Sequence, residues 1–235
     1  MIHKIVTSLH KYGLKKTVQR IVRSIKIYIS LTRDYWFDLK YGTDTKTFVP
    51  LESLRIDSHN KTCGVEYQPT RAIPFRKLIR MVNLPFVPKD IVFVDLGSGK
   101  GRALLLAAEF DFKRIVGIEF SPELCDIARK NVSIYQKKTG NTVPIEIIAD
   151  DVMNYKFINN ENFVYMANPF NSDILMNQVL NNIRDSYFNN PRDIILVYYN
   201  PVLRDIIEKH ENFRKREEYF LGGSTYVIYS FVEKV

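Results

Sequence analysis

Val94-Asp95-Leu96-Gly97-Ser98-Gly99-Lys100-Gly101-Arg102 is the stretch of sequence that decides the fold. The apolar run at residues 91–94 predicts a buried strand, and residues 103–110 predict a helix. Glycine at every second position allows positive φ angles and lets a ligand approach the main chain closely. A strand, a glycine-rich turn and a helix N-terminus in this order predict a site for a nucleotide-like ligand.

The spacing of the glycines excludes two common nucleotide sites. A dinucleotide fingerprint, G-x-G-x-x-G, would place a third glycine at position 102, where the chain has Arg102. A Walker loop, G-x-x-x-x-G-K-[ST], would place Ser or Thr after Lys100, where the chain has Gly101. The pattern that remains is D-x-G-x-G-x-G. Taken alone, it is also compatible with an ordinary tight turn between a strand and a helix.

The composition indicates one globular domain with an unevenly charged extension. The 235 residues suffice for one α/β domain plus an arm. Two cysteines and four scattered histidines predict neither disulfides nor a metal site, and they favour a reducing, cytoplasmic location. Residues 1–40 carry nine Lys or Arg against two Asp, a net +7 of the total +8. The rest of the chain is therefore nearly neutral.

Residues 1–40 are expected to form a basic, amphipathic helical arm. Between about residues 14 and 32, apolar residues recur at helical spacing and are interrupted by charges. This pattern predicts neither a signal peptide nor a membrane-spanning helix. In the simpler interpretation the apolar stripe packs on the chain's own domain. In the alternative, the arm contacts an anionic membrane or an acidic partner and makes the protein peripheral to the membrane.

The remainder of the chain alternates between strand and helix patterns. Residues 41–72 are loop-rich and predict a linker. Strands are predicted at 91–94, 114–118, 145–149, 163–167, 194–199, 217–221 and 225–232, and helices at 73–82, 100–110, 122–138, 172–186 and 201–210. Alternation followed by a final hairpin predicts a doubly wound, mostly parallel sheet.

The glycine stretch resembles motif I of the class I S-adenosylmethionine-dependent methyltransferases. The resemblance covers about residues 66–232 and implies a Rossmann-like sheet of seven strands with one antiparallel edge strand, with S-adenosyl-L-methionine as cofactor. It implies that residues 73–235 form the catalytic domain and that residues 41–72 also act as a cofactor lid. A narrower likeness to the non-SET histone lysine methyltransferases rests on residues 95–99, Glu119 and Asn168. The cofactor contacts expected from motif I are Asp95, Gly97, Ser98, Gly99 and Gly101.

Two acids at the ends of strands complete the expected cofactor site. Glu119 follows an apolar run at the distance where an acid accepts both ribose hydroxyls, although a surface Glu that caps the next helix is the alternative. Asp151 follows the third strand, where the resemblance implies a hydrogen bond from the adenine amino group. Val152 would then pack on the adenine ring, and Asp150 would replace the small residue that usually precedes the acid.

Asn168-Pro169-Phe170 ends the fourth predicted strand and is the expected catalytic set. The resemblance places this segment beside the transferred methyl group, where amine-directed enzymes often carry [DNS]-P-P-[FYW]. There the Asn oxygen and a backbone carbonyl hold the amine, an aromatic ring packs on it, and Asn168 also contacts the cofactor. This chain has a single proline, so its aromatic residue comes one position early. A strand-ending Asn-Pro turn is the alternative.

Two further segments are candidates for the site. Tyr67 and Thr70 precede the first helix of the domain and are expected at the methionine end of the cofactor. The segment 198–201 is expected to line the acceptor pocket. Residues 163–175 contain no His or Glu, and this lack of a base favours a nitrogen acceptor over a hydroxyl.

Three functions remain open on these observations. The first is a protein N-methyltransferase, with lysine as the candidate side chain. The second is a small-molecule or glycan N- or O-methyltransferase, held near a membrane by the basic arm. The third is a non-enzymatic module that binds a partner through the arm, and the complete set of glycines and acids argues against it. The sequence carries no motif for zinc or acyl-transfer chemistry and no specific nucleic-acid signal.

Overall fold

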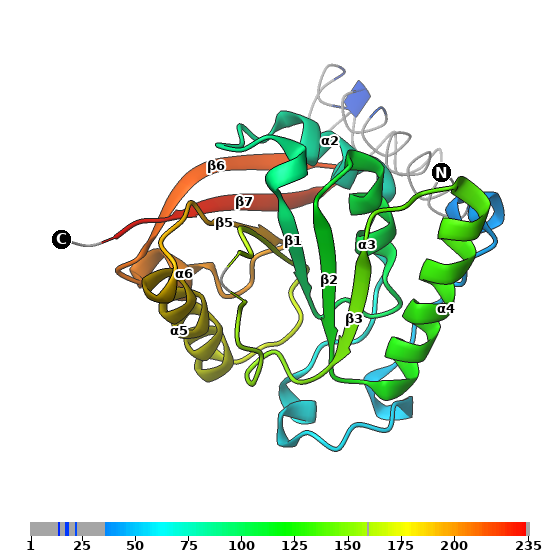
Figure 1. The fold of residues 1–235 in the computed structure, drawn as a ribbon, viewed down its shortest axis with the longest axis horizontal. Helices are drawn as coiled ribbons and strands as arrows, with labels where there is room; N and C mark the ends of the chain where they lie inside the picture. The colour runs from blue at the N-terminus through cyan, green and yellow to red at the C-terminus, as the bar shows by residue number, and fades with distance from the viewer. Residues whose placement is uncertain (1–13, 15–16, 19–21, 23–35, 159, 234–235) are drawn as a thin grey trace.

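A single seven-stranded sheet forms the centre of the molecule (Figure 1). The computed structural model describes residues 14, 17–18, 22, 36–158 and 160–233. In this part of the chain the strand order is β3-β2-β1-β4-β5-β7-β6. The strands are β1 (Val92–Leu96), β2 (Arg114–Glu119), β3 (Ile145–Ala149), β4 (Phe163–Met166), β5 (Ile195–Tyr199), β6 (Phe213–Leu221) and β7 (Ser224–Phe231).

The sheet confirms the predicted class with one correction. β1 to β5 are parallel, and β1 pairs with β2 on one side and with β4 on the other. The antiparallel strand was expected at an edge, but β7 lies between β5 and β6 and pairs antiparallel with both. The tight turn at Gly222 and Gly223 folds the chain back, so that β7 enters beside β5. The longer, charged β6 is left at the edge, where charges discourage pairing with another chain.

Helices cover both faces of this sheet (Figure 1). α2, α3 and α4 pack on one face, and α5 and α6 pack on the other. The α-helices are α2 (Ala72–Met81), α3 (Arg102–Ala107), α4 (Pro122–Thr139), α5 (Asp173–Asn189) and α6 (Arg204–Lys209), and the 3-10 helices are η1 (Leu51–Ser53), η2 (His59–Cys63), η3 (Pro88–Asp90) and η4 (Ala108–Phe110). Residues 36–41 are also helical.

Local sequence explains where the longest helices begin and end. The Ser121 hydroxyl accepts a hydrogen bond from the Leu124 backbone at 3.3 Å and caps α4, whose first residue is Pro122. α4 ends at Gly140, which has a φ of 69°. Ser172 caps α5 in the same way as Ser121 caps α4. These caps fix the helices that follow β2 and β4, and therefore the turns between strand and helix that hold the candidate site.

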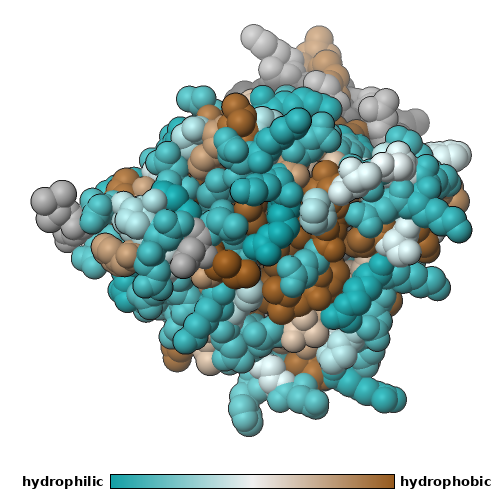
Figure 2. All heavy atoms as spheres, viewed as in Figure 1, coloured by the Kyte–Doolittle hydropathy of each residue, from teal (hydrophilic) through white to brown (hydrophobic). Residues whose placement is uncertain are grey.

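The connection from β3 to β4 contains no helix in its described residues, 150–158 and 160–162. Tyr155 and Phe157 bury their rings against the sheet instead. The buried carboxylate of Glu161 holds this segment, because it accepts hydrogen bonds from the Tyr155 hydroxyl at 2.5 Å and from the Ile158 backbone at 2.9 Å. In the view of Figure 2, hydrophilic residues cover most of the visible face of the molecule, while hydrophobic residues gather near the centre of that face.

The predicted amphipathic helix of residues 14–32 lies outside the described residues except at positions 14, 17, 18 and 22. Within the described part of the chain, no helix combines the length and the apolar character needed to cross a membrane.

Candidate functional site

The glycine turn lies at the carboxyl end of β1. Its three glycines are required for different structural reasons. Gly97 and Gly99 have φ values of 78° and 53°. A Cβ atom would lie 2.5 Å from Pro169 at the first position and 2.1 Å from the Tyr67 ring at the second. Gly101, with a φ of 84°, caps α3 and faces Ala128 of α4. Of these three glycines, only Gly97 and Gly99 line the pocket.

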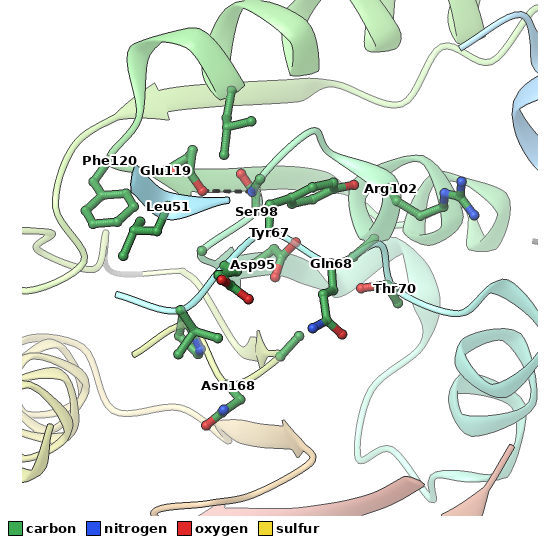
Figure 3. A pocket seen from close by; sticks show the side chains of 18 of the residues that line it. Leu51, Tyr67, Gln68, Thr70, Asp95, Ser98, Arg102, Glu119, Phe120 and Asn168 are labelled. Carbon is green, nitrogen blue, oxygen red and sulfur yellow. Dashed lines mark hydrogen bonds between the residues drawn. The ribbon is translucent and has the colours of Figure 1, made fainter. Parts of the chain in front are cut away.

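Glu119, at the end of β2, fastens the glycine turn to the next turn of the sheet. Its carboxylate accepts a hydrogen bond from the Gly99 N–H at 2.8 Å (Figure 3) and another from the Ser121 N–H at 2.9 Å. Burial raises the pKa of Glu119 to about 7, although backbone N–H donors oppose that shift. The sequence alternative, a surface Glu that caps a helix, is excluded because the side chain is buried and Ser121 supplies the cap.

Asp95, at the end of β1, is a buried acid that lacks a full set of partners. No described residue donates a hydrogen bond to its Oδ1 atom, and the same holds for the buried hydroxyl of Ser98. Burial, together with the nearby charge of Glu119, raises the pKa of Asp95 to about 8. Such orphaned polar atoms indicate a missing hydrogen-bonding partner. Both residues line the same pocket, between Glu119 and Asn168 in Figure 3.

A narrow slot continues this pocket along the ends of β2 and β3. Phe120, Val152 and Leu175 give it apolar walls, and Asp151 and Asn60 lie at its polar side. The Asp151 carboxylate accepts hydrogen bonds from the Ser58 hydroxyl at 2.5 Å, from the Asn60 side chain at 2.8 Å and from the Met153 backbone at 2.9 Å. A flat, partly aromatic slot with an acid at its edge suits a heterocyclic base.

Residues 58–70, called the strap below, cross the carboxyl edge of the sheet and close the site. The strap is tied to the segment after β4 by an isolated bridge between Gly64 and Phe170. The Val65 N–H donates to the Pro169 carbonyl at 3.1 Å, and the Asn171 N–H donates to the Cys63 carbonyl at 2.8 Å. The predicted loop-rich lid is thus a fixed part of the wall in this structure.

Phe170 does not lie where the sequence analysis expected it. The expected position was beside the acceptor amine, but its buried ring lines the slot with Asp151 and Val152. The bridge to Gly64 and the single proline after Asn168 turn the ring toward the slot. The structure therefore gives no support to the expected packing of Phe170 on the acceptor.

Tyr67 and Thr70 lie on the strap, at the other end of the pocket. The Tyr67 hydroxyl donates to the Thr45 carbonyl at 2.8 Å, and burial raises its pKa, so the hydroxyl stays protonated. Its ring lies against Gly99. Thr70 is buried and lines this pocket and a second cavity.

The second cavity, called the channel below, is lined by strap residues and by residues 46–48. It shares seven lining residues with the pocket, which are Val65, Glu66, Gln68, Thr70, Arg102, Ala167 and Asn168. Tyr199 and Asn200 from the end of β5 line the channel and not the pocket. Asn168 and Asn200 have φ values of 54° and 50° although each precedes a proline, so two strained Asn-Pro corners face one cavity.

A hydrogen bond from β5 holds the carboxamide of Asn168. The Tyr198 hydroxyl donates to Asn168 Oδ1 at 3.0 Å. Asn168 belongs to the walls of both the pocket and the channel, so its side chain stands at their junction. The oxygen that sequence analysis assigned to the acceptor amine thus already accepts one hydrogen bond.

Residues 38–46, called the brace below, support the glycine turn from outside. The buried carboxylate of Asp38 forms an ion pair with Arg102 at 3.2 Å and accepts the Thr43 and Thr45 hydroxyls, each at 2.7 Å. Lys100 and Asp44 pair at 3.1 Å. Figure 3 shows the Arg102 guanidinium turned away from Asp95 and Glu119. Arg102 therefore anchors the brace. A glycine at this position, as in a dinucleotide fingerprint, would lack this side chain.

Solved structures share this architecture. An RNA methyltransferase from Salinibacter ruber in complex with S-adenosyl-L-homocysteine has a TM-score of 0.50 at 22% identity, over 71% of this chain and 95% of its own. A SAM-dependent methyltransferase from Aquifex aeolicus has a TM-score of 0.53 at 15% identity, over 68% and 90%. Residues 73–185 match the model of the family "Histone methylation protein DOT1". The chain therefore shares the fold of these methyltransferases, and just under half of it matches the family model.

Two curated proteins are similar to part of this chain. Human EEF1A lysine methyltransferase 2 is 27% identical over 128 residues, which are 52% of this chain and 45% of the human protein. A protein-lysine N-methyltransferase from Saccharolobus islandicus is 34% identical over 85 residues, which are 36% of this chain and 48% of that protein. The chain thus spans about half the length of the curated relatives that it matches.

The candidate site contains residues that the sequence analysis missed. Ser58, Asn60 and Gln68 come from loops without periodicity, and Asp38 comes from the helical residues 36–41; no local pattern marks any of them. Phe120 was missed although it directly follows Glu119, and an aromatic side chain after a strand-ending acid is a usable signal. No group of three or more His, Cys, Asp or Glu side chains in the described part of the chain is arranged to hold a metal ion.

Proposed function

We propose that this chain transfers a methyl group from S-adenosyl-L-methionine to the side-chain amine of a lysine in a protein. The observation that carries the proposal is the position of Asn168. It lines both the pocket with the two buried acids and the channel that opens to solvent. An acceptor that entered through the channel would meet the cofactor at this residue.

The pocket fits the proposed cofactor in charge and in shape. Asp95 and Glu119 are buried acids that favour a partner with hydrogen-bond donors and positive charge, and the cofactor carries two ribose hydroxyls, an amino group and a sulfonium. Glu119 would accept the ribose hydroxyls, Asp151 and Phe120 would hold the adenine, and Tyr67 and Thr70 would enclose the methionine end. When bound, the cofactor supplies a methyl group activated by the sulfonium.

The channel supports an amine as the acceptor. Glu66 is the only acidic side chain among the described residues that line it, and this carboxylate would attract a lysine ammonium. The Asn168 carboxamide would orient the neutral amine, and the strap excludes water from the junction. The basic side chains of Lys46, Arg71 and Arg102 also line the channel. The Arg102 charge is paired with Asp38, and the Arg71 guanidinium donates to the Gly222 carbonyl.

The printed names of the curated relatives support lysine over other acceptors. Both are protein-lysine methyltransferases, and the matched family model is named for histone methylation. The Salinibacter ruber neighbour acts on RNA according to its name, but at 22% identity it supports the fold alone. We therefore favour a protein over a nucleic acid as the methyl acceptor.

Labelled cofactor incubated with the protein and a cell extract tests this function. We expect label in the protein fraction and, after acid hydrolysis, in methyl-lysine. Glu119→Gln should reduce labelling at limiting cofactor because cofactor binding is weakened. Asn168→Gly should retain cofactor binding but label at least about tenfold more slowly. Glycine is preferred to alanine here because the φ of Asn168 is 54°. Label confined to RNA, lipid or small molecules would contradict a lysine acceptor.

The membrane-held alternative and the domain boundaries also remain proposals. The basic arm of residues 1–40 ends in the helical residues 36–41, where Trp36 and Leu39 are exposed. If the arm binds an anionic surface, the intact chain should sediment with phosphatidylserine vesicles and a chain without residues 1–33 should not. Failure of the intact chain to sediment would exclude this role for the arm.

A further inference from the structure

The hydroxyl of Tyr198 connects the acceptor side of the site to the turn before α6. Tyr198 lies in β5 with a fully buried side chain, behind the walls of both the pocket and the channel. Its hydroxyl donates to Asn168 Oδ1 at 3.0 Å and accepts the Leu203 N–H at 3.4 Å. The hydroxyl therefore bridges the ends of β4 and β5.

This chain of hydrogen bonds has a fixed direction. A backbone N–H can only donate, so the Tyr198 oxygen accepts from Leu203, and its single proton is left for Asn168. The partner of that proton must be the carboxamide oxygen, because the amide nitrogen cannot accept. Burial also raises the pKa of Tyr198, which keeps the hydroxyl protonated. The orientation of the Asn168 carboxamide is thereby determined.

We propose that Tyr198 is a positioning residue, which holds the Asn168 carboxamide so that its oxygen keeps one lone pair for the acceptor amine. This proposal rests on the proposed function. Asn168 needs such support because its backbone is in the left-handed region before a proline and its side chain is only half-buried. A carbonyl oxygen has two lone pairs, so the bond from Tyr198 leaves one for the substrate.

Tyr198→Phe removes the hydroxyl and keeps the ring in the core. Tyr229→Phe is a matched control, because Tyr229 lies in the same core cluster, is equally buried, and has a hydroxyl without a hydrogen-bond partner among the described residues. We expect Tyr198→Phe to lower kcat about tenfold, as for the loss of one hydrogen bond, with an unchanged cofactor Kd. Tyr229→Phe should change kcat by less than about twofold. Equal losses in both variants would overturn the proposal.

A double variant separates positioning from general damage. If Tyr198 acts through Asn168, Tyr198→Phe should cause no further loss of kcat in the Asn168→Gly background. A further tenfold loss there would show an independent role and overturn the proposal.

Nuclear magnetic resonance of the protein alone tests the positioning without any turnover. The side-chain NH₂ signals of Asn168, assigned by their disappearance in Asn168→Asp, should shift and broaden in Tyr198→Phe and stay in place in Tyr229→Phe. Unchanged signals in Tyr198→Phe would overturn the proposal. If the wild-type protein methylates no protein at all, the lysine function fails, and this spectrum still decides whether Tyr198 holds Asn168.

Discussion

Arg102 and Asp38 form a buried ion pair at 3.2 Å that joins the glycine turn to the brace. The Arg102 Nε atom also donates to the Thr45 hydroxyl, and the guanidinium lies 4.6 Å from the centre of the Phe37 ring. The residue that rules out a dinucleotide fingerprint is therefore the residue that fixes the segment before the domain. Stability and cofactor binding should both depend on this pair.

Asp38→Asn should destabilise the protein strongly. The substitution keeps the shape of the side chain but leaves the Arg102 charge buried without its partner, which costs about 3 kcal/mol of unfolding free energy. Urea denaturation followed by circular dichroism measures this change. Asp126→Asn is the control, because the Asp126–Arg129 pair is largely exposed and should contribute less than about 1 kcal/mol. Similar losses in both variants would contradict the role given to the brace.

Glu119→Gln should weaken cofactor binding about 10- to 100-fold, the value of a hydrogen bond to a charged group. The fold should survive, since the glutamine oxygen still accepts one of the two backbone N–H groups that Glu119 now binds. Isothermal titration calorimetry gives the affinity directly. Glu123→Gln, at a partly buried acid four residues later that does not line the pocket, should bind as the wild type does. Equal cofactor affinity in the wild type, Glu119→Gln and Glu123→Gln would show that Glu119 does not bind the cofactor.

Gly99→Ala should be far more harmful than Gly140→Ala. Both glycines have positive φ, 53° and 69°, so both substitutions carry the same backbone cost of about 1 kcal/mol. Only at Gly99 does the new Cβ meet another residue, the Tyr67 ring at 2.1 Å, whereas nothing lies within 4 Å at Gly140. Thermal unfolding measures the difference. A second substitution, Tyr67→Ala, should restore part of the loss at Gly99 and none at Gly140.

Stability without cofactor should fall as pH rises through neutrality. The pKa values of Asp95 and Glu119 are raised from 3.8 and 4.5 to about 8 and about 7. The folded protein therefore keeps protons that the unfolded chain releases, and this contribution to the unfolding free energy is complete below about pH 4 and lost by about pH 8. Cofactor affinity should rise over the same range, because ionised carboxylates accept its hydroxyls and attract its charge.

Denaturation and calorimetry at about pH 5, 7 and 9 measure both trends. Asp95→Asn and Glu119→Gln should each flatten the dependence, since neither amide titrates. A wild-type protein whose stability rises from pH 5 to 9 would contradict the assignment of these two raised pKa values.

The sheet and the acids of the site were predictable because their signals are local. Apolar runs mark β2 and β3 almost to the residue, and the acids Asp95 and Glu119 stand at strand ends. β6 was predicted from residue 217 only, since its first half, with Arg214 to Arg216, is a charged edge without an apolar run. α6 was predicted from residue 201 but begins at Arg204, because the Asn200 corner and Pro201 delay it.

The contacts that the strap and the brace make could not be predicted from the sequence. Asn60 meets Asp151 across 91 positions, and Asp38 meets Arg102 across 64. Neither partner lies in a periodic segment, so only the assembled sheet brings them together. The direction of Phe170 was wrong for the same reason, since a bridge to Gly64 decides it.

The strap has a consequence for how the chain folds. Its bonds to Asp151 span 93 and 91 positions, so closing them should follow the pairing of the strands that carry their ends. We expect the parallel sheet to assemble first and the strap to close on it last. The edge of the sheet that carries the acids is thus open to water until the strap closes. A ligand bound at that edge should therefore stabilise the last part of the molecule to fold.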